Sequence, residues 1–339
     1  MNKHIFPFFN LNKRILALAP MDGYTDCAFR TVVKKYGKPD LMFTEFVNCQ
    51  GLLIATDRLI EILRYTENQR PIIAQLFGHE VEFFYKAALL VCELGFDGVD
   101  INMGCPARDI ASRGSGAGLI KTPDLALQII QTVKRALADY KSGKTLPLYQ
   151  DVKNKKLKLW KIKVQKKREI TVSVKTRIGY EKDSTSEWIK TLVSAKPDFI
   201  SLHARTFKQG YKGKAFWEAI KKAVTVSPLP VIGNGDVGCF DDIQRLFKET
   251  NCAGVMIGRA AVGKPWIFQK QIEKYSSFPE AKKIALEQVK IYVLYKGEKK
   301  FHEMRKQLLA YFKGFPKSKS LRIKLSQVSC AQDVLSILK

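Results

Sequence analysis

Two glycine-rich stretches in the last third of the chain decide the fold. The first is Pro230-Val231-Ile232-Gly233-Asn234-Gly235-Asp236-Val237-Gly238, and the second is Gly254-Val255-Met256-Ile257-Gly258-Arg259-Ala260-Ala261-Val262-Gly263. Each begins as a short apolar run typical of a buried strand and continues into a turn whose glycines let backbone N–H groups approach an anion. The alternative is that the glycines serve only tight turns. Two such loops in succession are typical of the phosphate site after the seventh and eighth strands of a (β/α)8 barrel.

Six further strands are predicted upstream of these two. Segments with helical spacing follow most of them, for example Val81–Leu94 and Asp124–Ala136. Continuously apolar strands that alternate with helices indicate a parallel sheet covered on both faces. We therefore predict an α/β fold with a (β/α)8 TIM barrel over residues 1–276. The six strands are short runs rich in Val, Ile and Leu, at Ile15–Ala19, Leu41–Glu45, Ile72–Leu76, Gly98–Asn102, Ile170–Lys175 and Phe199–His203.

A doubly wound sheet is the alternative for the same alternation. It would normally carry a Gly-x-Gly-x-x-Gly turn after the first strand, whereas the sequence there is Ala19-Pro20-Met21-Asp22-Gly23. A barrel brings the ends of all its strands to one mouth, where active sites lie. A phosphorylated ligand is therefore expected at the mouth: FMN, a sugar phosphate or pyridoxal phosphate. The polar residues at the predicted strand ends are Glu45, Gln75, Asn102, Lys175, Arg177, His203, Asn234, Asp236 and Arg259.

A basic insertion interrupts the barrel pattern at residues 139–169. Eleven basic and two acidic residues lie between Lys141 and Glu169. Lys156–Val164 alternates like a strand and Thr145–Val152 is placed to pair with it, which predicts a basic β-hairpin arm. The alternative is a solvated loop without a partner.

The end of the chain is also basic. From Phe278 onward there are fourteen basic and five acidic residues, and Arg305–Gly314 has the spacing of a helix that ends at a glycine. Residues 277–339 are therefore predicted to form a small, basic, all-helical domain, joined through a linker at Ser277–Pro279.

The composition limits the classes of function. The net charge is +26, which attracts nucleic acid or an anionic membrane, although a lysine-rich proteome would give the same charge without a function. No apolar run is long enough to span a bilayer, and Met1–Asn12 lacks the features of a signal peptide, so a soluble cytoplasmic protein is expected. The seven cysteines form no Cys-x-x-Cys pair and no His-Glu-x-x-His occurs, so neither disulfides nor a metal site is expected.

Three residues at the predicted mouth carry the candidate chemistry. Cys105 follows the fourth strand, and its thiol is either a buried structural group or a nucleophile or general acid. Lys175 ends the fifth strand, where it would form a Schiff base, lie beside a flavin ring, or pair with a carboxylate such as Glu45. His203 ends the sixth strand as a structural residue or a cofactor contact.

Taken in order, seven segments resemble the tRNA-dihydrouridine synthases of bacteria. Each lies at a predicted strand end, and the resemblance extends over roughly Ile15 to Phe268. Arg305–Pro316 is also similar to the start of that family's helical domain. The long insertion departs from the family, in which this connection is short. The seven segments are Ala19–Asp26, Gln75, Asn102–Pro106, Val174–Gly179, His203–Thr206, Gly233–Asp236 and Gly258–Ala260.

The resemblance implies reduction of the C5=C6 bond of uridines in tRNA by a tightly bound FMN. Flavin N5 would give a hydride to C6, Cys105 a proton to C5, and NADPH would reduce the flavin again. Asn102 and Arg177 would orient a uracil flipped into the mouth, while the basic helical domain grips the tRNA. A monomer is expected. The implied FMN contacts are Pro20, Met21, Asp22, Gln75, Lys175, His203, Asn234, Gly235, Asp236, Gly258 and Arg259.

Three other functions fit parts of the sequence. A phosphate-binding aldolase with Lys175 as its Schiff base leaves Cys105 and the basic domain without a role. A flavin reductase of free pyrimidines would share the barrel but would not need a basic domain. A non-catalytic RNA-binding barrel protein would be favoured if Lys175 or Cys105 were missing, and both are present.

Overall fold

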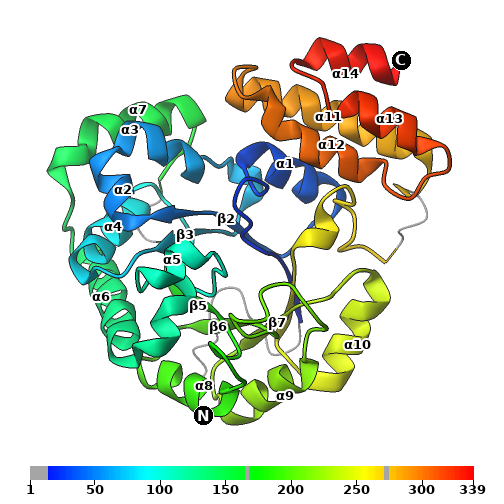
Figure 1. Cartoon of the computed structure of the whole chain (residues 1–339). Coiled ribbons are helices and arrows are strands. Elements are labelled where there is room, and N and C mark those ends of the chain that lie inside the picture. Colours follow the sequence, from blue (N-terminus) through cyan, green and yellow to red (C-terminus); the bar gives the residue numbers. More distant parts are fainter. Residues whose placement is uncertain (1–13, 165–167, 271–274) are drawn as a thin grey trace.

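Eight parallel strands form a closed barrel at the centre of the chain. A computed structural model describes residues 14–164, 168–270 and 275–339. Each strand pairs with the next along the chain, and β1 pairs with β8 to close the sheet (Figure 1). The predicted (β/α)8 barrel is therefore confirmed. The strands are β1 (Ile15–Leu18), β2 (Leu41–Asn48), β3 (Ile72–Phe77), β4 (Gly98–Met103), β5 (Thr171–Arg177), β6 (Phe199–His203), β7 (Val231–Asn234) and β8 (Gly254–Ile257).

Helices cover the outside of the barrel, and four more follow it. The first group is α1 (Cys27–Tyr36), α2 (Cys49–Ile54), α3 (Thr56–Leu59), α4 (Val81–Glu93), α5 (Arg108–Ser112), α6 (Pro123–Lys141), α7 (Gln150–Trp160), α8 (Thr185–Ser194), α9 (Trp217–Val226) and α10 (Phe240–Thr250). The second group is α11 (Phe278–Lys296), α12 (Arg305–Tyr311), α13 (Ser318–Leu325) and α14 (Ala331–Leu338). No helix in the described part of the chain has the length and apolarity needed to cross a membrane.

The inside of the barrel is filled with side chains. Phe43 and Phe199 are fully buried there, together with aliphatic residues such as Ile73 and Ile232. A filled interior leaves no channel through the barrel, so ligands are restricted to the loops at its ends. The loops at the carboxyl ends of the strands carry the predicted site residues.

The C-terminal helices pack directly on the barrel. Ala28 and Val32 of α1, with Trp266, belong to the same apolar cluster as residues of α11, α12 and α14. The predicted linker at Ser277–Pro279 is wrong, because Ser277 caps α11 by accepting from the Glu280 N–H at 3.4 Å and Pro279 lies in its first turn. Backbone N–H groups in the first turn of a helix have no intrahelical partner, so a proline there costs no hydrogen bond. The Ser-Phe-Pro stretch that resembles a linker can therefore begin the helix.

The predicted basic β-hairpin is also wrong, because the insertion forms a helix. Residues 150–160 form α7, whose buried positions Lys153, Lys156 and Trp160 have the spacing of one helix face. Lys153 Nζ lies 2.6 Å from Glu93 Oε2, and Lys156 Nζ lies 2.7 Å from Glu61 Oε1. These two lysines therefore face the core of the protein, whereas the hairpin prediction placed Lys153 in the turn and Lys156 at the start of the second strand. Residues 165–167 lie outside the described residues, as do 1–13.

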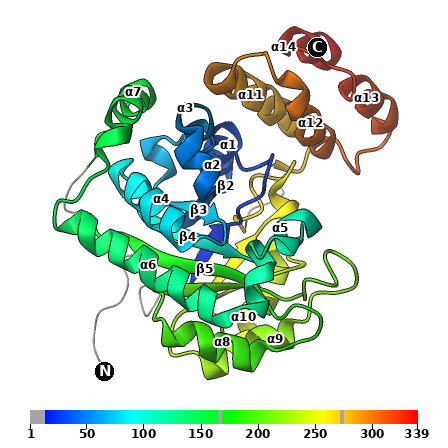
Figure 2. The ribbon, with the colours of Figure 1, turned by 60° about the vertical axis from the view of Figure 1, so that its left-hand side comes forward.

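The helix α7 lies at the end of the barrel opposite to the carboxyl ends of the strands. Its partner Glu93 ends α4, just before β4 begins, and Arg168 pairs with Asp97 at the same end. In Figures 1 and 2, α7 also stands apart from α11–α14. We therefore infer that the insertion stabilises the barrel and takes no part in forming its mouth.

We expect Lys153→Met to destabilise the protein by about 3 kcal/mol, because it leaves the Glu93 carboxylate buried without its counter-charge. The side chain of Glu93 is only 2% exposed. Lys155→Met, on the exposed face of the same helix, is the matched control. The midpoints of chemical unfolding measure the difference, and equal midpoints for the two variants would contradict this role for the pair.

Candidate functional site

One large cavity opens at the carboxyl ends of the strands. Its volume is about 1040 Å³, and all fourteen residues that the sequence singled out for the site line it. Glu45 is the exception among the strand-end residues, because it lies behind the loop after β1 and accepts from the Gly23 N–H at 2.5 Å. Lys306 and Ala310 of α12 and the loop residue Tyr211 also line the cavity. Those three were missing from the sequence-based set.

A chain of hydrogen bonds fixes the residues before Cys105. Asn102 Oδ1 accepts from the Gly104 N–H at 3.0 Å and from the Cys105 N–H at 2.9 Å. Asn102 Nδ2 donates to Gln75 Oε1 at 3.1 Å, and Gln75 Nε2 donates to Asp100 Oδ2 at 2.7 Å. The amide of Asn102 thus holds the turn that carries Cys105, and it helps to fix the position of the thiol.

The thiol of Cys105 is held in its protonated form. Its residue is 8% exposed, and burial raises its pKa above the usual value, with Asp22 and Asp109 adding to the rise and Arg177 opposing it. A thiol with a raised pKa carries its proton throughout the neutral range. The group is therefore suited to donate a proton and poorly suited to act as a thiolate nucleophile.

Lys175 projects from β5 into the same cavity. Burial and, to a smaller extent, the nearby charge of Arg177 lower its pKa to about 8, and Asp100 partly offsets these two effects. Asp100 accepts from Ser173 Oγ at 2.5 Å, and burial raises its pKa to about 6. Lys175 is therefore a buried cation close to its titration point, which an anionic ligand would hold in the charged form.

Arg177 joins two loops of the mouth. Its Nε donates to Gly104 O at 2.7 Å, next to Cys105, and its Nη1 donates to Thr206 O and Gly210 O at 2.9 Å each. Two of its nitrogens are thus engaged with the backbone, although the residue also lines the cavity. It fixes the cysteine turn relative to the loop after β6.

Tyr211 lies on that loop and was not found from the sequence. Its ring is 59% exposed and lies under two guanidinium groups, with Arg177 Cζ at 5.8 Å and Arg259 Cζ at 5.0 Å from the ring centroid. The glycines Gly210 and Gly213 on either side of it, both with positive φ, were the sequence signal of a tight loop that presents an aromatic ring.

The loops after β7 and β8 form a cradle at one side of the cavity, which three of their glycines line: Gly235, Gly238 and Gly258. A Cβ at Gly235 would lie 2.9 Å from the Ala215 side chain, so only glycine leaves room there. Asp236 accepts from Arg205 Nη2 at 2.6 Å and from the Ala215 N–H at 2.7 Å, and therefore organises the loop. The side chain of Arg259 is 61% exposed and only weakly paired with Asp236 at 3.5 Å, so its guanidinium remains available to an anion.

His203 and Asn234 complete this side of the mouth. Burial lowers the pKa of His203 far below its usual value, and the cations Lys175 and Arg177 lower it further, so the ring is neutral. Asn234 Nδ2 donates to Met256 O at 2.8 Å and ties β7 to β8. Taken together, glycine backbone, an exposed guanidinium and a neutral imidazole fit the phosphate of a flavin mononucleotide, while the volume of the cavity also accommodates its ring system.

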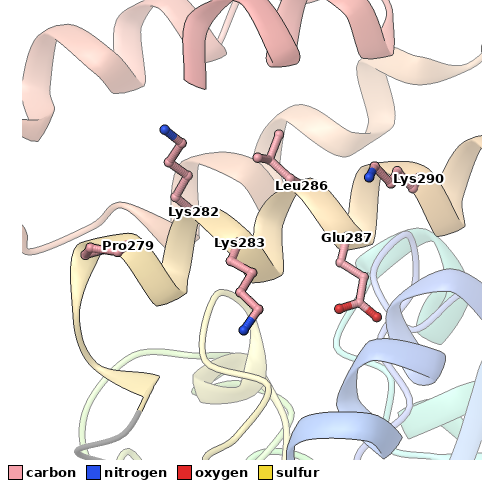
Figure 3. A pocket seen from close by; sticks show the side chains of 6 residues that line it. All are labelled: Pro279, Lys282, Lys283, Leu286, Glu287 and Lys290. Carbon is pink, nitrogen blue, oxygen red and sulfur yellow. The ribbon is translucent and has the colours of Figure 1, made fainter. Parts of the chain in front are cut away.

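A second hollow lies along α11. Its volume is about 610 Å³, and its lining, shown in Figure 3, comes from this helix alone. Its acid Glu287 is already paired with Lys35 and Tyr36 at 2.6 Å each. The carboxylate of this hollow is therefore already engaged, whereas the buried thiol of Cys105 and the buried ammonium of Lys175 line the mouth. Among the described residues, no group of His, Cys, Asp and Glu is arranged to hold a metal ion.

Comparison with known proteins gives a family match along most of the chain. A family model described as dihydrouridine synthase (Dus) matches residues 17–162 and 145–339. The probable tRNA-dihydrouridine synthase of Aquifex aeolicus (strain VF5) is 33% identical over 318 residues, covering 92% of this chain and 91% of that protein. The probable tRNA-dihydrouridine synthase 2 of Bacillus subtilis (strain 168) is 34% identical over 275 residues, covering 79% and 75%.

Solved structures share the barrel at low sequence identity. Histamine dehydrogenase from Rhizobium sp. 4-9 aligns with a TM-score of 0.53 and 13% identity, over 81% of this chain and 48% of that one, so this chain spans about half of its length. TcOYE with pHBA aligns with a TM-score of 0.50 and 11% identity, over 79% and 93%. At such identities the likeness concerns the fold alone.

Proposed function

This chain belongs to the dihydrouridine synthase family, and we propose on that basis that it reduces the C5=C6 bond of uridines in tRNA to 5,6-dihydrouridine. FMN would be its tightly bound cofactor and NADPH its electron donor. The observation that carries the proposal is the pairing of a protonated, buried thiol with a buried lysine in one cavity large enough for a flavin and a base.

The residues of the mouth divide between the two ends of the cofactor. The cradle after β7 and β8 would hold the phosphate, through Asn234, Gly235, Asp236, Gly258 and Arg259, with His203 nearby. The ring system would lie against the residues after β1 and at the ends of β3 and β5: Pro20, Met21, Asp22, Gln75 and Lys175. Lys175 would supply the positive charge beside the ring that favours its anionic reduced form.

The chemistry of uracil explains the need for an acid. C6 is electrophilic because the C5=C6 bond is conjugated with the C4 carbonyl, and the bound FMN supplies the hydride that C6 accepts. Cys105 then donates its proton to C5, which completes the saturated ring. Asn102, whose amide accepts from the Cys105 N–H, would help to orient the base, while Arg177 holds the loop of the thiol in place.

The target base must leave the tRNA stack to reach this cavity, because the thiol lies below the rim of the barrel. The basic helical region α11–α14 would bind the surrounding phosphates. The insertion at residues 139–169 lies at the other end of the barrel, so we do not assign it a part in this contact.

The absorption spectrum of the purified protein tests the proposal. We expect flavin bands that bleach on addition of NADPH and return on addition of unmodified tRNA, with dihydrouridine found in the recovered tRNA. A colourless protein that cannot be reconstituted with FMN would overturn it.

Schiff-base chemistry is the second candidate, favoured by the lowered pKa of Lys175. It predicts that borohydride traps a phosphorylated aldehyde or ketone on Lys175 in a flavin-free protein. Mass spectrometry of the treated protein distinguishes the two functions, because the flavoenzyme forms no such adduct.

A further inference from the structure

A lysine of the helical region lines the cavity at the mouth of the barrel. Lys306 of α12 lines the cavity, and its Nζ lies 4.1 Å from the centroid of the Tyr24 ring, in the loop after β1. We propose that Lys306 binds a backbone phosphate of the tRNA at the nucleotide that enters the mouth, which makes it a substrate-positioning residue. The inference rests on the proposed function and extends it to a named contact.

Lys306 is held in place by the packing of α12. Gly263, in the loop after β8, lies so close to this helix that a Cβ would be 2.4 Å from the carbonyl carbon of Ala310. Gln307 Nε2 donates to Tyr24 O at 3.4 Å, and Leu308 is fully buried in the cluster shared with the barrel. The backbone of α12 is therefore held against the loops after β8 and β1, and Lys306 extends from it over the Tyr24 ring.

The loop after β1 leaves space for the ammonium. Gly23 has a φ of +67°, and a Cβ built on it would lie 2.5 Å from Lys306 Nζ. The Gly23 N–H donates to Glu45 Oε1 at 2.5 Å, which ties this loop to β2. Glycine at this position satisfies the backbone conformation and also opens the path of the lysine to the rim.

Lys306 keeps its hydrogen-bond donors free. Within the part of the chain that the structure describes, no carboxylate forms an ion pair with it, and its contact is the face of an aromatic ring. Lys296, also at this boundary, differs in that its Nζ lies 2.8 Å from Glu303 Oε2 and 3.3 Å from Asp26 Oδ2. A cation held by a ring face retains all three N–H donors for an anion, whereas Lys296 is already neutralised.

The position of Lys306 favours an RNA phosphate over the phosphate of the cofactor. The cradle after β7 and β8 already offers glycine backbone and the exposed Arg259 to the cofactor. Lys306 lies over Gly23 and Tyr24, at the rim contributed by the helical region, where the strand of tRNA must pass to deliver a flipped base.

The test measures affinity of the oxidised, FMN-loaded full-length protein for an unmodified tRNA transcript. Lys306→Gln should weaken binding on the order of tenfold and lower the slope of log K against log salt by about one, with FMN content and thermal stability retained. Lys306→Arg should restore most of the affinity. Lys155→Gln removes the same charge at the opposite end of the barrel and should change the affinity by less than about twofold.

Two results would overturn the inference. One is an equal affinity of the Lys306→Gln and Lys155→Gln variants for tRNA. The other is loss of FMN from Lys306→Gln with tRNA affinity unchanged, because the ammonium would then serve the cofactor. Affinity is measured without turnover, so a wild-type protein that binds tRNA but forms no dihydrouridine would count against the proposed function and not against this contact.

Discussion

Replacing Cys105 with alanine is expected to leave FMN bound and to lower dihydrouridine formation by about 10²–10⁴-fold, the usual contribution of a general acid. The substitution removes the only atom that the proposal assigns to protonation of C5. The turn keeps its shape, because Asn102 and Arg177 hold it through backbone groups that alanine retains. Gly116 lies against the Cβ of residue 105, an atom that cysteine and alanine both have. The loss is therefore chemical rather than structural.

Single-turnover experiments separate the two halves of the reaction. Reduction of the flavin by NADPH should proceed in Cys105→Ala, while reoxidation by tRNA should stall. Cys239→Ser is a matched control, since Cys239 is exposed and serine also caps the helix that it begins. Because burial raises the pKa of Cys105, the wild-type rate should show no loss of this acid between pH 6 and about 8. Normal turnover in the alanine variant would exclude the acid role.

The barrel could be predicted because its strands are buried on both faces. Runs such as Ile15–Ala19 and Gly254–Gly258 are apolar throughout, and only a covered parallel sheet accommodates many of them in succession. The site followed from topology, since the carboxyl ends of parallel strands in a closed barrel meet at one place. Residues more than 200 positions apart, such as Met21 and Arg259, could therefore be placed at one mouth without knowledge of any contact.

The errors arose where tertiary partners decide the local structure. Lys153 and Lys156 look solvent-facing in the sequence, and only the buried Glu93 and the nearby Glu61 turn them inward on a helix. Lys306 was not identified as a site residue from the sequence, for a related reason. Its role depends on how the helical region packs on the loop after β1, and no sequence pattern records that packing.

The second large effect is expected for Lys175→Met, which removes the cation that would lie beside the proposed flavin ring. We expect product formation to fall by about 10²–10³-fold, in the range of a lost electrostatic contact in a buried site. The pKa of Lys175 is about 8 in the flavin-free protein and would be raised by an anionic reduced flavin, so the wild-type rate should fall only as the pH rises above about 8. The variant should lack that decline, and methionine keeps most of the side-chain volume.

The same substitution should make the flavin-free protein more stable, which separates this role from a structural one. The pKa of Lys175 in the folded protein, about 8, lies below the usual 10.5, so the unfolded chain binds more protons between these values. The cost of burying the cation is full below pH 8 and disappears as pH rises towards 10.5. Lys175→Met should therefore unfold at a higher temperature than wild type at pH 7, with the gap narrowing above pH 8. A variant that is both inactive and less stable at pH 7 would assign Lys175 to the core of the barrel instead.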